Sequence, residues 1–232
     1  NKMIQEKQIK KEYEGRPDKP FNLFSPSQIG YCRRQMYNRK MNLTNMPRNV
    51  KGIVHSGTRN HFWLEHELPK LAEDRGLETE RKLKAELELD EEEFNLYVSG
   101  LADGIDTEGY VYDHKFTSNT SYAPKDKDIR QVMMYIYALD DVHTGRLEYV
   151  KDGNRFVKDG QFKFVEVEFD REEFIKMVGR MRDVAKKVQE RKGTKKELVN
   201  PFDKCDCFFC DSEEPKEEVN KALMDLEDGE DA

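Results

Sequence analysis

Residues 106–109 (Asp-Thr-Glu-Gly) most restrict the fold, because they place turn-forming residues between two stretches with partial polar and apolar alternation, 94–102 and 110–116. Such a segment predicts a tight β-hairpin. Successive side chains of a strand point to opposite faces, so Asp113 and Lys115 are expected on one face and His114 on the other. Asp103 precedes the turn, so its carboxylate can converge with that of Asp113.

Helices are predicted on both sides of this hairpin. Ser25 as N-cap, followed by Pro26 and Gln28, marks a helix start, and the helix is expected to run to about Lys40. Asp170, in a capping box with Glu173, begins a long C-terminal helix that ends at Gly193, and helices are also expected at 56–74 and 127–140, with strands at 78–88, 145–150 and 162–168. This order predicts an α/β fold in which helices flank a mixed central sheet.

Charge is distributed unevenly along the 232 residues, whose formal net charge is −7. Residues 211–232 hold ten acidic residues and two lysines, which gives −8 and leaves +1 for residues 1–210. We therefore expect a charged N-terminal arm (1–20), one folded domain (21–210) and an acidic, disordered tail (211–232). The chain has no run of 18 apolar residues and no signal-peptide pattern near residue 1, so the expected location is the cytoplasm, or the host cytoplasm if the protein is viral, without a membrane.

Two carboxylates in close contact repel each other unless a cation lies between them. Oxygen ligands of this kind suit Mg²⁺ or Mn²⁺, and a lysine beside them adds a positive charge near a phosphate and an attacking water. His61, on the predicted 56–74 helix, is a candidate third ligand that would favour Mn²⁺. Gln131 and Tyr135 are four residues apart on one helix face, where they can brace Lys115 or contact a phosphate. Each of these residues alone is more often a surface or core residue.

Together, in this order, these residues resemble the RecB-like branch of the PD-(D/E)XK nuclease superfamily. The matching segments span residues 25–210: Gly57 to His61, Gly100 to Asp103, Asp113 to Lys115 with Asp in place of the commoner Glu, and Gln131 with Tyr135. The resemblance implies a PD-(D/E)XK core that cleaves DNA, usually as an exonuclease, acting on single strands or ends. It implies catalytic roles for Asp103, Asp113, Lys115, Gln131 and Tyr135, and metal binding by His61, Asp103, Asp113 and the backbone near His114.

Four cysteines form a second candidate site: Cys32, and Cys205, Cys207 and Cys210 near the other end of the chain. Clustered cysteines inside cells indicate metal ligands rather than disulfides, with free buried thiols as the alternative. One cysteine before the core and three after it also resembles the iron–sulfur members of the branch, such as the AddB nuclease domain and the stand-alone fourth CRISPR-associated family. That resemblance implies a 4Fe–4S cluster that ties the C-terminal part to the first helix. The Cys-x-Cys spacing is tighter than usual, so structural Zn²⁺ stays the alternative.

The sequence therefore predicts a metal-dependent DNA exonuclease, with DNA as partner. An endonuclease or a CRISPR prespacer-processing partner is one alternative, and an inactive iron–sulfur DNA-binding adaptor is another. A protein partner in recombination, replication or CRISPR adaptation and a homo-oligomer are further expectations. Basic clusters on the first and last helices either guide the DNA backbone or form ordinary solvated faces. They comprise Arg33, Arg34, Arg39 and Lys40, followed by Arg48 and Lys51, and Lys186, Lys187, Arg191, Lys192, Lys195 and Lys196 near the end of the last helix.

Overall fold

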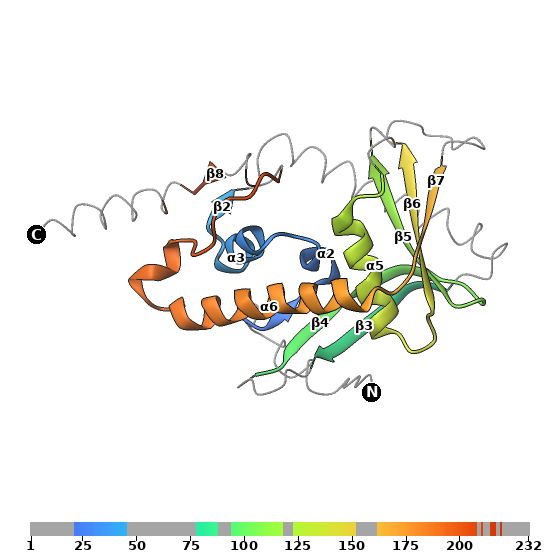
Figure 1. Cartoon of the computed structure of the whole chain (residues 1–232), viewed down its shortest axis with the longest axis horizontal. Helices are drawn as coiled ribbons and strands as arrows, with labels where there is room; N and C mark the ends of the chain where they lie inside the picture. The colour runs from blue at the N-terminus through green and yellow to red at the C-terminus, as the bar shows by residue number, and fades with distance from the viewer. Residues whose placement is uncertain are drawn as a thin grey trace, which may run out of the picture.

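The computed structural model describes residues 21–45, 78–87, 94–117, 123–151, 162–207, 210, 214–216 and 219. Its centre is a six-stranded mixed sheet with β1 (Leu23–Phe24), β3 (Glu78–Leu87), β4 (Leu96–Ile105), β5 (Tyr110–Thr117), β6 (Thr144–Lys151) and β7 (Phe162–Val167). β3, β4 and β5 are antiparallel neighbours, β6 is parallel to β5, and β7 returns antiparallel to β6. The predicted α/β class with a mixed sheet is confirmed (Figure 1).

Helices flank this sheet. α5 (Asp126–Ala138) packs on β5 and β6, while α6 (Arg171–Arg191) runs along α3 (Arg33–Met41), as Figure 1 shows. The α6 helix places Phe174, Met181, Ala185 and Val188 in the core. Burying side chains of this size stabilises a fold by about 1.5–3 kcal/mol each, so packing of these faces is what holds the helices in place.

The first predicted helix is two helices, and the expectation of one helix to Lys40 is wrong. α2 (Pro26–Ile29) begins at the predicted N-cap Ser25, whose backbone N–H donates to Gln28 Oε1 at 3.1 Å. The chain then leaves the helix at Gly30, and α3 starts anew with Cys32 as its N-cap. The Cys32 sulfur accepts the Gln35 backbone N–H at 3.4 Å, so a residue singled out as a metal ligand also caps a helix.

Close approach between elements depends on two glycines. A Cβ at Gly145 of β6 would lie 1.9 Å from Val132 Cγ1 of α5, so only glycine lets α5 pack this closely on the sheet. A Cβ at Gly100 of β4 would lie 2.5 Å from Pro26 Cδ. These contacts fix α5 against β6 and α2 against β4, the strand that carries Asp103.

Several remaining predictions are close to the observed bounds. The turn at 106–109 joins β4 to β5, and Gly109 adopts a left-handed conformation with φ +85. Asp170 caps α6 by accepting the backbone N–H groups of Glu172 and Glu173 at 2.9 and 3.1 Å. The Glu173 side chain instead pairs with Arg130 of α5 and with Arg180 of α6.

The fold continues beyond the expected domain boundary at residue 210. β8 (Glu214–Pro215) pairs antiparallel with β2 (Thr44–Asn45), and Val219 is buried in the core. A short 3-10 helix, η2 (Lys195–Leu198), follows α6. The predicted helix 56–74 and the arm 1–20 lie outside the described residues. Within the described part, none of the helices has the length and apolar character needed to traverse a lipid bilayer.

Candidate active site

The sheet opens between β4 and β5 close to the hairpin. The two strands pair at Gly104↔Tyr112 and Ile105↔Val111, next to the turn. Beyond this point a side chain replaces the strand-to-strand backbone hydrogen bond: Asp103 Oδ2 accepts the backbone N–H of His114 at 2.7 Å. Asp103 is thereby held against β5 at the residue that separates Asp113 from Lys115, so the hairpin itself brings the two acidic residues together.

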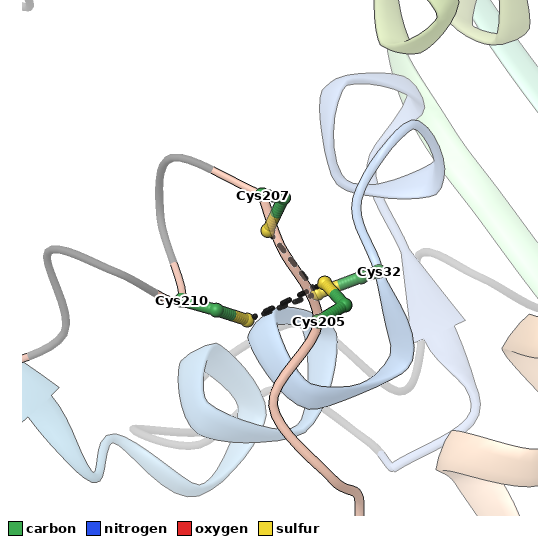
Figure 2. A group of neighbouring side chains, drawn as sticks. All are labelled: Cys32, Cys205, Cys207 and Cys210. Atoms are coloured by element: carbon green, nitrogen blue, oxygen red, sulfur yellow. Dashed lines mark hydrogen bonds between the residues drawn. The ribbon is translucent and has the colours of Figure 1, made fainter.

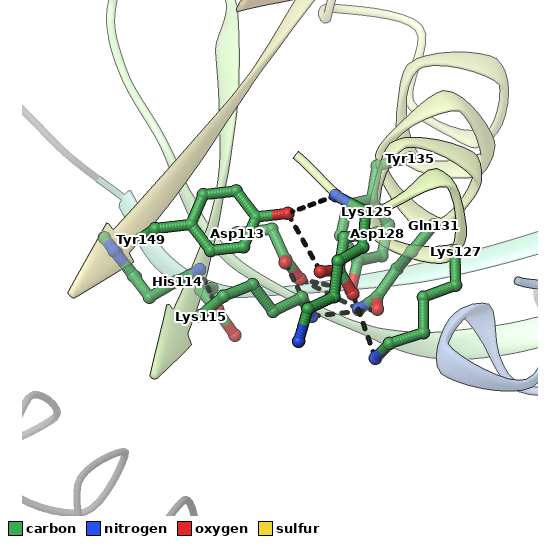
Figure 3. Close-up of polar contacts among 10 residues, drawn as sticks. Asp113, His114, Lys115, Lys125, Lys127, Asp128, Gln131, Tyr135 and Tyr149 are labelled. Atoms are coloured by element: carbon green, nitrogen blue, oxygen red, sulfur yellow. Dashed lines mark hydrogen bonds and ion pairs between the residues drawn. The ribbon is translucent and has the colours of Figure 1, made fainter. Parts of the chain in front are cut away.

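Asp113, Lys115, Gln131 and Tyr135 form one connected network between β5 and α5 (Figure 3). Lys115 Nζ lies 2.7 Å from Asp113 Oδ2 and donates to Gln131 Oε1 at 2.9 Å. The Gln131 amide donates to Asp113 Oδ1 at 2.8 Å and contacts Tyr135 Oη at 2.6 Å. Gln131 therefore bridges the carboxylate and the ammonium, which fixes their relative positions.

Two further residues of this site were not predicted from the sequence. Asp128, in the first turn of α5, is 2% exposed, and its Oδ2 accepts a hydrogen bond from the Tyr149 hydroxyl at 2.9 Å. Tyr149 lies on β6, opposite Lys115, and its oxygen also accepts the Lys125 backbone N–H at 3.1 Å. The one available signal was the spacing of Asp128 and Gln131, which are three residues apart and so share a helix face.

The electrostatics of the network follow from burial and close charges. Burial raises the pKa of Asp113 to about 6, the neighbouring Lys115 acts against this shift, and the Asp103 carboxylate adds to it. Burial lowers the pKa of Lys115, but the carboxylates of Asp113 and Asp128 outweigh this effect and raise it above its usual value. Lys115 is therefore a cation at neutral pH, held among acidic groups.

The opposite face of the sheet has a different character. The His114 imidazole points there, and its Nδ1 lies 3.0 Å from Glu148 Oε2, which leaves only the backbone of His114 for the metal role implied by the resemblance. A cavity of about 700 Å³ lies on this face, and four of its eight lining residues are acidic while one is an arginine. The lining residues are Asp106, Thr107, Glu108, Tyr112, Arg146, Glu148, Phe164 and Glu166. Arg146 is already paired with Glu166 at 3.1 Å, so this face repels phosphates.

The other predicted site residues have different outcomes. His61 lies outside the described residues, so its position relative to the carboxylates rests on the resemblance. The basic residues of α3 are engaged within the fold. They contact α6, the segment after η2 and the first residues of the domain: Arg33 with Asp183, Arg34 with the Phe202 carbonyl, Arg39 with the Tyr31 ring and Lys40 with the Leu23 carbonyl.

The four cysteines meet at a second site (Figure 2). Cys32 Sγ lies 3.6 Å from Cys210 Sγ and 3.9 Å from Cys207 Sγ, and Cys205 Sγ lies 3.6 Å from Cys210 Sγ. All four sulfurs lie within 4.8 Å of one another, so they can hold a metal together. Burial raises the pKa of Cys210 to about 11 and that of Cys32 further, so these two thiols are protonated at neutral pH. Each must lose its proton to bind a metal.

The sulfur spacing bears on the kind of metal. A single tetrahedral zinc with Zn–S bonds of about 2.3 Å places its sulfurs roughly 3.8 Å apart. In a 4Fe–4S cluster each thiolate binds a separate iron, so the sulfurs stand wider apart. Three of the separations are 3.6–3.9 Å and all lie within 4.8 Å, which is closer to the spacing around a single ion than to that of the cluster that the resemblance implies.

Comparison with known proteins places the fold. No protein-family model and no curated protein matches the chain. The crystal structure of SSO0001 superposes with a TM-score of 0.53 at 14% identity, over 87% of this chain and 89% of that one. This likeness establishes a shared fold.

Two exonucleases superpose less closely. An alkaline exonuclease from Laribacter hongkongensis gives a TM-score of 0.48 at 11% identity, over 73% of this chain and 89% of that one. A phage-related exonuclease from Haemophilus somnus 129PT gives 0.37 at 17% identity, over 57% and 70%.

Proposed function

We propose that this chain is a divalent-metal-dependent deoxyribonuclease that hydrolyses phosphodiester bonds. One observation carries the proposal: carboxylates from two adjacent strands, Asp103 and Asp113, converge beside the Lys115 ammonium, which lies 2.7 Å from Asp113. Two acids and a lysine at one opening of a sheet are the groups that metal-assisted phosphoryl hydrolysis requires. This arrangement differs from an ordinary surface ion pair, because Asp113 is 1% exposed and is held by both Lys115 and Gln131.

The donor set fits a hard divalent cation. Asp113 is buried, and the adjacent Asp103 carboxylate raises its pKa, so the pair gains from a cation that neutralises it. Asp103 and Asp113 would hold Mn²⁺ or Mg²⁺, with His61 and the His114 carbonyl as the additional ligands implied by the resemblance. When bound, such an ion supplies charge for the phosphate and lowers the pKa of water.

The protein residues around this pair have separate roles in the proposal. Lys115 orients the attacking water and stabilises the negative charge that builds up on the phosphate. Gln131 holds Lys115 and Asp113 at 2.9 and 2.8 Å, so that neither can turn away. Tyr135, whose hydroxyl lies 2.6 Å from the Gln131 amide, fixes the orientation of that amide.

The mode of cleavage comes from the family resemblance, which implies an exonuclease acting on single-stranded DNA or on DNA ends. An endonuclease or prespacer-processing partner would use the same residues on DNA without free ends. An inactive adaptor would bind DNA and leave it intact, and the complete set of Asp103, Asp113 and Lys115 argues against it.

A labelled-substrate assay tests the proposal. Purified protein is incubated with single- and double-stranded DNA whose ends are free or blocked, with Mn²⁺, Mg²⁺ or a chelator. We expect Mn²⁺- or Mg²⁺-dependent mononucleotide release from free ends, and none from Lys115→Ala. Lys176→Ala removes an exposed lysine of α6 and serves as the matched control. Equal activity of Lys115→Ala and the parent chain would refute the assignment.

We further propose that the four cysteines hold a structural metal. The family resemblance implies a 4Fe–4S cluster, whereas the sulfur separations of 3.6–3.9 Å favour a single Zn²⁺. Absorbance near about 400 nm on anaerobically purified protein separates the two, because iron–sulfur proteins are coloured and zinc sites are colourless. Metal and acid-labile sulfide analysis of the same sample gives an independent answer.

A further inference from the structure

Asp128 is a buried acid that the proposed hydrolysis does not use. It is 2% exposed, and burying a carboxylate is unfavourable unless its oxygens find partners. The partner of Oδ2 is the Tyr149 hydroxyl at 2.9 Å. The partner of Oδ1 is Lys127 Nζ at 3.1 Å. A buried carboxylate between these two groups gives a fixed anchor for the lysine.

Lys127 is held at both ends. Its ammonium curves back to Asp128, as Figure 3 shows, although its side chain keeps 39% of its surface exposed. Its backbone is packed against Gly30, where a Cβ would lie 2.4 Å from the Lys127 carbonyl oxygen and 2.7 Å from its Cα. The lysine therefore presents a solvent-accessible positive charge in a restricted position, which lowers the entropy cost of binding an anion.

The position of this charge relates it to the proposed active site. Lys127 lies four residues before Gln131 on α5, which is about 6 Å along the helix axis. Gln131 in turn contacts Asp113 and Lys115. On the opposite sheet face, acidic residues line the cavity around Arg146, so a DNA backbone is favoured on the Lys127 side.

We propose that Lys127, anchored by Asp128, is a positioning residue that binds a phosphate of the DNA strand next to the scissile phosphate. This inference rests on the proposed nuclease function. Lys115 acts at the reacting phosphate, and Lys127 sets the register of the strand on α5. Tyr149 contributes by holding the carboxylate that holds the lysine.

Salt-dependent DNA binding tests the inference. Fluorescence anisotropy with a single-stranded oligonucleotide is measured without divalent metal, so that no cleavage occurs. We expect Lys127→Gln to weaken binding several-fold and to reduce the slope of log K against log salt by about 0.7, the contribution of one phosphate. Lys127→Arg should keep the slope, and Lys176→Gln on α6 is the charge-matched control that should leave it unchanged.

Two variants distinguish anchoring from charge alone. Asp128→Asn keeps Lys127 but weakens the ion pair that anchors its ammonium. Gly30→Ala displaces the backbone of Lys127. Both should raise KM, because positioning a neighbouring phosphate contributes mainly to substrate binding. If Asp128→Asn does not fold, Lys127→Gln decides the question on its own.

The inference and the proposed function fail differently. An unchanged salt slope for Lys127→Gln, with or without a lower melting temperature, would show that Lys127 only neutralises Asp128, and the inference would be overturned. A parent protein that binds DNA with the expected slope but never cleaves it would refute the nuclease function and leave Lys127 as a DNA contact.

Discussion

The carboxylate site and the cysteine site differ in how the chain assembles them. Asp103 and Asp113 are ten residues apart, on two strands joined by one turn, and protein hydrogen bonds already hold both in place. Cys32 and Cys205 are 173 residues apart, and the four sulfurs come together from two distant segments of the chain. A site built on one hairpin keeps its geometry without its metal, whereas a site that joins distant segments depends on it. We infer that the first site serves catalysis and the second stability.

The segment after α6 has additional contacts with α3 near the cysteines. Asn200 Nδ2 donates to the Arg34 carbonyl at 2.9 Å, and Arg34 donates to the Phe202 carbonyl at 2.8 Å. The Phe202 ring packs edge-on against Tyr37 at 6.0 Å. Loss of the cysteine metal is therefore expected to destabilise the chain without unfolding it completely.

The largest expected effect separates the sites by activity. Asp113→Asn should lower cleavage by at least about 10³-fold, because in the proposed nuclease it removes a metal-binding charge at the reacting phosphate. The melting temperature should stay equal or rise, since the variant removes a buried charge next to Asp103. Gel-based cleavage and thermal denaturation on the same sample measure both quantities. A large fall in melting temperature would mean that Asp113 serves the fold, which would break the comparison.

A smaller effect on activity is expected from Gln131→Leu. This variant leaves Asp113 and Lys115 in place but removes their bridge, and misplacement of a catalytic group by about 1 Å costs up to about 10²-fold in rate. Steady-state kinetics should show the loss mainly in kcat. Gln189→Leu, an exposed glutamine of α6, is the matched control. An unchanged kcat would show that Lys115 and Asp113 hold each other without Gln131.

The opposite pattern is expected at the cysteine site. Cys210→Ser removes a buried thiol that we propose as a metal ligand, so we expect loss of bound metal and a melting temperature lower by about 5–10 °C, equivalent to a few kcal/mol. The rate per folded molecule should change by less than about threefold. Differential scanning fluorimetry with and without chelator measures this. A chelator that still lowers the melting temperature of Cys210→Ser would mean that the quartet is not the structural metal site.

The smallest expected effect is a dependence on pH. Burial raises the pKa of Asp113 from 3.8 to about 6, so the folded chain binds this proton more tightly than the unfolded chain does. The metal-free protein should therefore lose stability as the pH rises from about 4 to about 6, with no further change from this group above that. Because a cation competes with the same proton, Mn²⁺ affinity should increase over the same interval. Calorimetric titration measures the Mn²⁺ affinity at each pH. Asp113→Asn should flatten the pH dependence of both the stability and the Mn²⁺ affinity.

Local sequence determined the parts of the fold whose partners are close along the chain. The turn at 106–109 and the alternation after it predicted that Asp113 and Lys115 share a face, and the Asp170 cap predicted the start of α6. These features depend on φ/ψ preferences, strand alternation and hydrogen bonds within three or four residues, which a single sequence displays directly.

Tertiary structure decided what depends on distant residues. The break between α2 and α3, the contact of Gly30 with Lys127 and the pairing of Asp128 with Tyr149 each involve elements packed from separate segments. The sequence left open whether the arginines of α3 guide DNA or form a solvated face, and only packing showed that Arg33 contacts Asp183 and Arg34 contacts the Phe202 carbonyl. Sequence specifies which side chains carry charge, but the partner of each charge is set by packing, because hydrogen bonds and ion pairs require donor and acceptor to be brought into direct contact.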